Sequence, residues 1–292
     1  MKKVLNNWDL NAISELFSTA GKIALNYFNS PPAELKSDQS VVTVADREIE
    51  QLFAGCCDCP SEQVFLIGEE TIASHSTEYI NSALAADCCW ILDPIDGTAP
   101  YSAHLELWGI SLGLMRQGRI VEGAVYLPCL DTMLITSNGQ LLSRSLNPAS
   151  EWREFAPSQS PLGSYGHIAI GQTQAHSWCF DGSNQLFAWS SCVGALYWLL
   201  SGRVIAYCGD FKLWDIAGFL PILNVLGYPF LSATSECRQL SCDLADGGFI
   251  LEQTTDRWRV KSPFIAAPDR QTALNIMQKF HPAHANKKVS MS

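Results

Sequence analysis

Apolar residues recur at helical spacing near the start of the chain and in short, strand-like runs after it. Over residues 9–28 they fall every three or four positions, which predicts an amphipathic helix with Asn7 or Asp9 as its cap. The dipeptide Asn138-Gly139 is typical of a tight hairpin turn. The first half is expected to hold helices over 9–28 and from Thr43, then strands over 64–67, 89–92, 107–115, 119–127 and 132–136.

A segment without periodicity separates this part from a second half. Residues 144–163 are rich in Ser, Pro and Asn, which is typical of a linker. Beyond it, strands should alternate with helices, as in α/β proteins: strands over 165–170, 186–189, 204–207, 248–251 and 264–266, and helices over 193–200, 214–226 and 268–280. Pro221 should kink the helix over 214–226. We therefore predict an N-terminal α+β half, residues 1–150, and a C-terminal α/β half, residues 151–292.

The composition is that of a folded, acidic protein. The chain has 292 residues, 47% of them hydrophobic, which allows one large or two medium domains. Asp and Glu outnumber Lys and Arg by 29 to 19, and a net charge of −10 disfavours binding to a nucleic-acid backbone. No apolar stretch reaches the roughly 20 residues that span a bilayer, and polar residues interrupt the opening segment, so we expect neither a membrane span nor a secretory signal.

The eleven cysteines do not form a metal-binding pattern. The clusters at 56–59 and 88–89 lack paired C-x2-C spacing and a nearby His, which a structural zinc site would need. We interpret them as reduced, partly buried thiols, and we expect the protein to be cytoplasmic.

Carboxylates are placed for chemistry in the segment Trp-Ile-Leu-Asp-Pro-Ile-Asp-Gly-Thr, residues 90–98. A buried strand would bring Asp93 and Asp96 to its carboxyl end, where α/β sheets hold their sites. Gly97 allows close approach of a ligand to the backbone. Thr98 could cap a following helix whose free N–H groups would seat an anion. The alternative interpretation is an ordinary Asp-Gly turn after a strand.

The chemistry of these side chains favours magnesium. Two carboxylates with no neighbouring His suit Mg²⁺ better than zinc. Phosphatases of the haloacid dehalogenase type are excluded, because their nucleophilic Asp would fall at Pro94. Further acids stand at the predicted end of a strand, Glu69, and at the predicted starts of helices, Asp46 and Asp215. Each of these three, taken alone, is also explained as a surface or capping residue.

Together these segments resemble the inositol monophosphatase family along nearly the whole chain. Residues 36–46 resemble its K-x-D-x-S-x-V-T-x-A-D stretch, and Ile67-Gly-Glu-Glu70 resembles its G-E-E element. The segment 93–98, followed by 109–113, resembles its first signature, and 212–217 its W-D-x-A signature. Four motifs in the family's order are far more specific than any one of them.

This resemblance implies a layered α/β fold, αβαβα, and a Mg²⁺-dependent, lithium-sensitive phosphomonoesterase that forms a homodimer. It implies two or three Mg²⁺ ions and a small phosphorylated substrate. The implied ligands of the first metal are Glu69, Asp93 and the carbonyl of Ile95, and those of the second are Asp93, Asp96 and Asp215. Asp46 and Thr98 would position the attacking water. The implied substrate-binding residues are Asp96, Gly97, Thr98 and Asp215, the N–H groups of Gly97 and Thr98 seating the phosphate.

Several positions depart from the family pattern and leave the substrate open. Pro100 stands where the family usually has Asn, and Glu106 where it often has Pro. Ser190-Ser191-Cys192 replaces a stretch that touches substrate, and either Cys208 or Asp210 takes the place of the acid that contacts inositol hydroxyls. The candidates are inositol monophosphate, a sugar phosphate or bisphosphate, histidinol phosphate and 3′-phosphoadenosine 5′-phosphate. A catalytically silent binding protein on the same fold is the alternative from another class.

Overall fold

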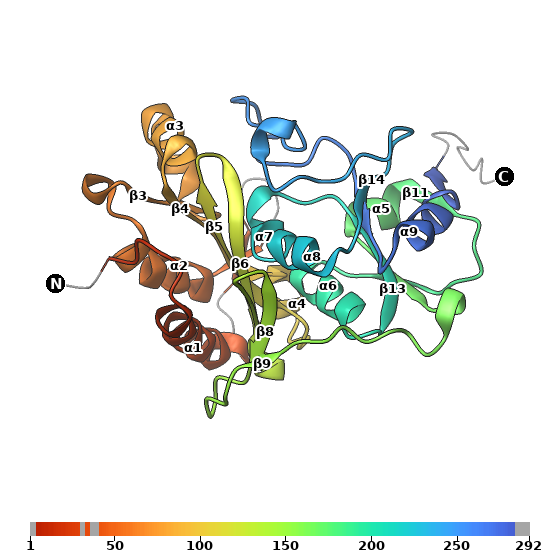
Figure 1. Ribbon diagram of the computed structural model, residues 1–292, viewed down its shortest axis with the longest axis horizontal. Coiled ribbons are helices and arrows are strands. Elements are labelled where there is room, and N and C mark those ends of the chain that lie inside the picture. The colour runs from red at the N-terminus through yellow and green to blue at the C-terminus, as the bar shows by residue number, and fades with distance from the viewer. Residues whose placement is uncertain (1–3, 30–32, 36–40, 284–292) are drawn as a thin grey trace.

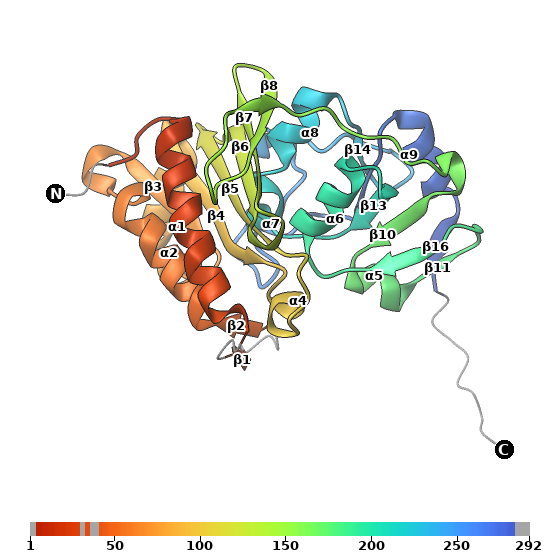
Figure 2. The same ribbon diagram turned by 90° about the horizontal axis from the view of Figure 1, so that it is seen from below.

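The computed structural model of this chain describes residues 4–29, 33–35 and 41–283. The segment 36–40 of the first motif and residues 284–292 lie outside them. The two largest β-sheets alternate with three layers of helices (Figures 1 and 2). The layered αβαβα fold expected from the family resemblance is confirmed.

The larger sheet has seven strands in the order β3-β4-β5-β6-β7-β8-β9, and only β3 and β4 run parallel. Its strands are β3 (Val64–Gly68), β4 (Cys88–Asp96), β5 (Gly109–Arg116), β6 (Arg119–Leu127), β7 (Thr132–Ser137), β8 (Gln140–Arg144) and β9 (Arg153–Glu154). Helices α1 (Leu10–Phe28) and α2 (Val44–Cys57) cover one face (Figure 2). Asp9 caps α1 and Thr43 caps α2, as the sequence indicates.

The second sheet has five strands in the order β12-β10-β13-β15-β14. They are β10 (His167–Ile170), β12 (Leu186–Ala188), β13 (Val204–Gly209), β14 (Phe230–Ser232) and β15 (Phe264–Ala266). Helices α5 (Gln172–Ser177) and α9 (Arg270–Met277) lie on its outer side, and α6 (Cys192–Leu200), α7 (Leu213–Ala217) and α8 (Leu220–Leu226) lie between the two sheets (Figure 2). The short elements β1 (Ala33–Leu35), β2 (Val41–Thr43), β11 (Trp178–Phe180), β16 (Phe280–Pro282), α3 (Thr77–Ala85) and α4 (Thr98–Ser102) complete the fold.

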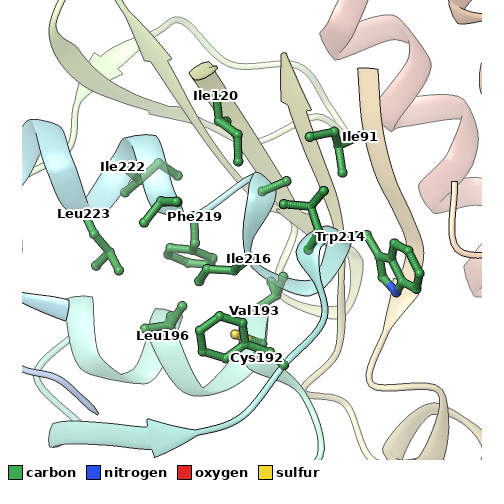
Figure 3. Packing of buried hydrophobic residues seen from close by; sticks show 14 of the residues in the cluster. Ile91, Ile120, Cys192, Val193, Leu196, Trp214, Ile216, Phe219, Ile222 and Leu223 are labelled. Atoms are coloured by element: carbon green, nitrogen blue, oxygen red, sulfur yellow. The ribbon is translucent and has the colours of Figure 1, made fainter. Parts of the chain in front are cut away.

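A continuous apolar core joins the two sheets through the middle layer of helices. Ile216 of α7, Ile222 of α8 and the intervening Phe219 face the larger sheet, where Ile91 and Ile120 lie (Figure 3). Burial of such side chains contributes roughly 1.5–3 kcal/mol each. The packing therefore fixes α7, which carries a candidate site residue, against the strand that carries two others.

Three expectations about the second half were wrong. The helix over 214–226 is two helices, because Pro221 stands in the first turn of α8, where its missing N–H costs no hydrogen bond. The expected strand at 248–251 makes one isolated bridge, Phe249 to Val260. The last helix is shorter than 268–280, since Asp269 caps α9 and β16 begins at Phe280.

The expected linker is partly structured. Its residues 153–154 form β9 and pair with β8, so this segment extends the larger sheet. The division into halves at residue 150 stays a prediction. Among the described residues, no helix has the length and apolar character needed to cross a membrane.

Small residues let α7 approach the larger sheet closely. A Cβ atom on Gly123 would lie 2.2 Å from the carbonyl oxygen of Gly218, and one on Gly113 would lie 2.8 Å from Cβ of Ala217. Both contacts are shorter than the sum of van der Waals radii allows. Glycine is therefore required here for packing.

We predict that Gly123→Ala lowers the free energy of unfolding by about 1–3 kcal/mol, because the added methyl group pushes the α7–α8 junction away from β6. Denaturant unfolding measures the change. Val121→Ala is the control on the same strand, because Val121 is 37% exposed. A Gly123→Ala protein as stable as the wild type would contradict the close packing described here.

Candidate metal centre

Strand β4 of the larger sheet carries Asp93 and Asp96 near its carboxyl end. All nine residues of the strand are buried, and the pairing with β5 shifts between Asp93 and Asp96, where Pro94 stands. Such an irregularity is where a strand tolerates proline. The N–H of Ile95 donates to Oδ1 of Asp93 at 3.1 Å. The backbone itself therefore orients the first carboxylate.

Gly97 turns the chain away from β4 into α4. Its φ of +92° is in the left-handed region, and a Cβ atom there would lie 2.6 Å from Cβ of Ser191. Gly97 is the N-cap of α4 and Thr98 its first residue. The expectation that Thr98 caps this helix was wrong, because the backbone turns one residue earlier.

Asp215 reaches the same place from the second half. It stands in the first turn of α7, and its Oδ2 accepts a hydrogen bond from the N–H of Lys212 at 2.9 Å. One carboxylate oxygen from each of Asp93, Asp96 and Asp215 lies within 4.8 Å of the others. Within the described ranges no other cluster of His, Cys, Asp and Glu meets this criterion.

The start of α6 holds Asp96. Its Oδ2 accepts hydrogen bonds from the hydroxyl of Ser191 at 2.5 Å and the N–H of Val193 at 2.7 Å, and its Oδ1 accepts one from the N–H of Cys192 at 3.0 Å. The stretch Ser190-Ser191-Cys192, aligned above with a substrate-contacting segment, thus also orients a candidate metal ligand.

Glu69 stands at the end of β3, next to this cluster. Its N–H donates to the carbonyl of Leu92 at 3.2 Å, and its charge raises the pKa values of Asp93, Asp96 and Asp215. Its carboxylate is outside the group of three oxygens but close enough to act on each of them electrostatically.

Glu50 of α2 supports the loop that carries Glu69. It is 1% exposed, and its carboxylate accepts hydrogen bonds from the N–H groups of Glu70 and Thr71, each at 2.9 Å, and from the Thr71 hydroxyl at 2.5 Å. The sequence analysis missed this residue. The available signal was a carboxylate four residues after Asp46, on the apolar face of an amphipathic helix.

Asp46 and Thr98 face each other at the edge of hydrogen-bond distance. Oγ1 of Thr98 is 3.5 Å from Oδ1 of Asp46 and donates to the carbonyl of Ile95 at 3.1 Å. The other oxygen of Asp46 accepts from the N–H of Thr43 at 2.8 Å and from its hydroxyl at 2.5 Å. Asp46 therefore holds the start of α2 while one of its oxygens faces Thr98.

Burial dominates the electrostatics of the site. It raises the pKa of Asp46 and of Asp96 to about 7 and the pKa of Asp215 to about 8, and it raises the pKa of Asp93 well above its usual range. The charges of neighbouring carboxylates contribute to the raised pKa values of Asp93 and Asp215. A divalent cation has the opposite effect, since it favours the ionised carboxylates.

The donor set fits magnesium. The carboxylates of Glu69, Asp93, Asp96 and Asp215 and the carbonyl of Ile95 offer only hard oxygen ligands. Oxygen ligands without His or Cys are what Mg²⁺ prefers in proteins.

A cavity of about 230 Å³ opens beside Asp96 and Asp215. Its walls combine apolar rings with polar groups: Trp189, Tyr207 and Phe211, and Ser190, Ser191, Asp210 and Arg259. Of the two residues left open by the sequence, Asp210 lines this cavity, whereas Cys208 is buried in β13.

Asp210 is paired at the cavity wall. Nη1 of Arg259 lies 2.7 Å from its Oδ2, and Nε2 of Gln174 donates to its Oδ1 at 3.2 Å. The sequence analysis found neither partner, because each comes from a distant segment.

The sequence of this chain is similar to those of known proteins. A model of the inositol monophosphatase family matches residues 8–272. The chain is 27% identical over 236 residues to the uncharacterized protein y4fL of Sinorhizobium fredii, covering 75% of this chain and 78% of that protein. It is 26% identical over 232 residues to a histidinol-phosphatase of Chlorobaculum parvum, covering 75% of this chain and 83% of that protein.

Solved structures share the fold. A staphylococcal inositol monophosphatase crystallised with its products superposes with a TM-score of 0.68 at 18% identity, covering 93% of this chain and 95% of that one. The match over residues 8–272 includes all the candidate site residues. The chain belongs to the inositol monophosphatase family.

Proposed function

We propose that this protein is a Mg²⁺-dependent phosphomonoesterase that hydrolyses a small phosphorylated alcohol. The observation that carries the proposal is the convergence of Asp93, Asp96 and Asp215 within 4.8 Å on the fold of this family. All five acidic positions that the resemblance requires are present, with Glu69 and Asp46 beside the cluster. A catalytically silent binding protein would have no need to retain the whole set.

The proposed metal ligands are Glu69, Asp93, the carbonyl of Ile95, Asp96 and Asp215, and the resemblance implies two or three Mg²⁺ ions. Bound Mg²⁺ would neutralise phosphate charge and lower the pKa of water. The chain's own contribution is to fix the carboxylates, through Ser191 and the N–H groups that hold Asp96 and through Lys212 N–H at Asp215.

Asp46 and Thr98 are the proposed groups that position the attacking water. The Thr98 hydroxyl would accept from water when it donates to Asp46, which requires closing the present 3.5 Å separation and giving up its bond to Ile95. Asp46 would act as the acceptor that orients the Thr98 hydroxyl. The start of α4 at Gly97 and Thr98 is the proposed phosphate seat.

The cavity beside the metal centre favours a compact alcohol. Its volume of about 230 Å³ suits a single ring such as inositol better than a nucleotide. Histidinol phosphate is the second candidate, because one relative carries that activity in its name and because Trp189 offers an aromatic face at the cavity wall. Lithium sensitivity, a homodimer and a cytoplasmic location remain part of the proposal.

A panel of phosphate esters tests the proposal. We expect Mg²⁺-dependent release of phosphate from inositol 1-phosphate or histidinol phosphate, loss of activity in excess chelator and recovery with Mg²⁺. Asp93→Asn should reduce kcat far more than Glu70→Ala, because Asp93 belongs to the cluster and Glu70 does not. Full turnover in chelator would refute a metal-dependent mechanism, and equal losses would show that the glutamates are misassigned.

Thr98→Ala and Asp46→Asn should each lower kcat by about 10² or more with the fold retained, as expected for proton-transfer groups. The double variant should be little worse than either single one, because the pair acts as a unit. Steady-state kinetics and circular dichroism measure the two effects. If Asp46 only holds the start of α2 and Thr98 only binds the carbonyl of Ile95, melting temperatures fall and kcat of the folded protein stays normal.

Glu50→Ala should raise the Mg²⁺ concentration for half-maximal activity about 10- to 100-fold, as when a group that orients a metal ligand is lost. Activity should recover largely at saturating Mg²⁺, because Glu50 acts through the Glu69 loop. Glu48→Ala, on the exposed face of the same helix, is the control. An unchanged Mg²⁺ requirement with a lowered melting temperature would assign Glu50 a purely structural role.

A further inference from the structure

A second cavity borders the candidate metal centre at Glu69, one of the proposed metal ligands. It measures about 470 Å³. One wall comes from the first half of the chain and includes Glu69, Glu70 and His75. The other wall consists of Lys212, Trp214, Gln253, Thr254, Thr255, Arg257 and Trp258. We call it the Lys212–Arg257 cavity after its two cationic side chains.

Both cations are held against indole rings. Nζ of Lys212 lies 5.4 Å from the centre of the Trp214 ring, and Cζ of Arg257 lies 4.7 Å from that of Trp258. In the part of the chain that the structure describes, no carboxylate forms a salt bridge with either cation. Contacts of this kind order a side chain without neutralising its charge. The wall therefore presents two positive charges in a chain whose net charge is −10.

Hydrogen-bond donors on the same wall also lack acceptors. Trp214 is 3% exposed, and its Nε1 has no partner among the described residues. Nε of Arg257 is buried and likewise without an acceptor there. Figure 3 shows the Trp214 indole at the margin of the apolar cluster, apart from the side chains of α8. Because buried N–H groups are nearly always paired in proteins, an acceptor belongs at this wall.

The loop that supplies Arg257 has a strained backbone. Trp258 has a φ of +76°, which is costly for a bulky residue, and its N–H donates to the carbonyl of Ile250 at 2.7 Å. On either side of Trp258, Arg257 lines the Lys212–Arg257 cavity and Arg259 lines the cavity beside Asp215. Arg259 is neutralised by Asp210, whereas Arg257 has no such partner among the described residues.

We propose that the Lys212–Arg257 cavity binds an oxyanion, a phosphate or carboxylate group, between these two side chains. A guanidinium and an ammonium together offer the charge and the donors that such a group requires. This subsite is separate from the proposed metal-bound phosphate. Its occupant is either a second anionic group of the substrate or a free anion.

Calorimetric titration of the Mg²⁺-loaded protein with inorganic phosphate tests the proposal. The wild type should bind two phosphates per chain, and Arg257→Gln should weaken one of the two sites at least 10-fold. Arg257→Lys should retain part of the affinity, and circular dichroism checks that the variants fold. Arg116→Gln is the matched control. Arg116 is the last residue of β5, whereas Gly109, the first residue of this strand, pairs with Asp96 of the candidate site. Arg257 is preferred to Lys212, because the charge of Lys212 also acts on Asp215.

Phosphate binding with the same stoichiometry and affinity in Arg257→Gln and in the wild type would overturn the proposal. Phosphate binding at a single site that needs Arg257 and persists in chelator would support the proposed anion site. The same result would contradict the proposed phosphatase function, so failure of one proposal can be distinguished from failure of the other. Displacement of phosphate from the Arg257-dependent site by fructose 1,6-bisphosphate, but not by fructose 6-phosphate, would assign it to a second group of the substrate. Displacement by neither would assign it to a free anion.

Discussion

Repulsion among buried carboxylates is the constraint that the rest of the site has to satisfy. Asp93 and Asp96 are 2% and 5% exposed, and Asp215 points at both of them. Burying like charges together is costly unless they are neutralised or hydrogen-bonded. The chain supplies part of the compensation through N–H groups of Ile95, Cys192, Val193 and Lys212 and the hydroxyl of Ser191. The divalent cation that we propose would supply the rest.

The site exists only where the two halves of the chain meet. Strand β4 carries two of the carboxylates, while α7 carries the third and α6 orients Asp96. Gly113 and Gly123 let α7 approach the sheet closely enough for this. The geometry of the carboxylates therefore depends on the apolar packing of the middle helical layer. Looser packing would move Asp215 away from Asp93 and Asp96.

The sequence predicted what depends on local pattern. Strand β4 with its two aspartates and the helix starts near Asp9 and at Thr43 follow from neighbouring residues. Contacts between distant segments could not be predicted: Ser191 with Asp96 spans 95 residues, and Arg259 with Asp210 spans 49. The helix containing Pro221 was misjudged because one proline is compatible with a kink or with a new helix start. The choice depends on packing against β6, where Gly218 meets Gly123.

The central claim is that Asp93, Asp96 and Asp215 together hold divalent metal. Anomalous diffraction from crystals grown with Mn²⁺, which takes the same oxygen ligands as Mg²⁺, tests it most directly. We expect an anomalous peak within bonding distance of carboxylate oxygens from all three residues. Fully formed crystals with no peak at this cluster, or with Mn²⁺ bound only elsewhere, would contradict the account.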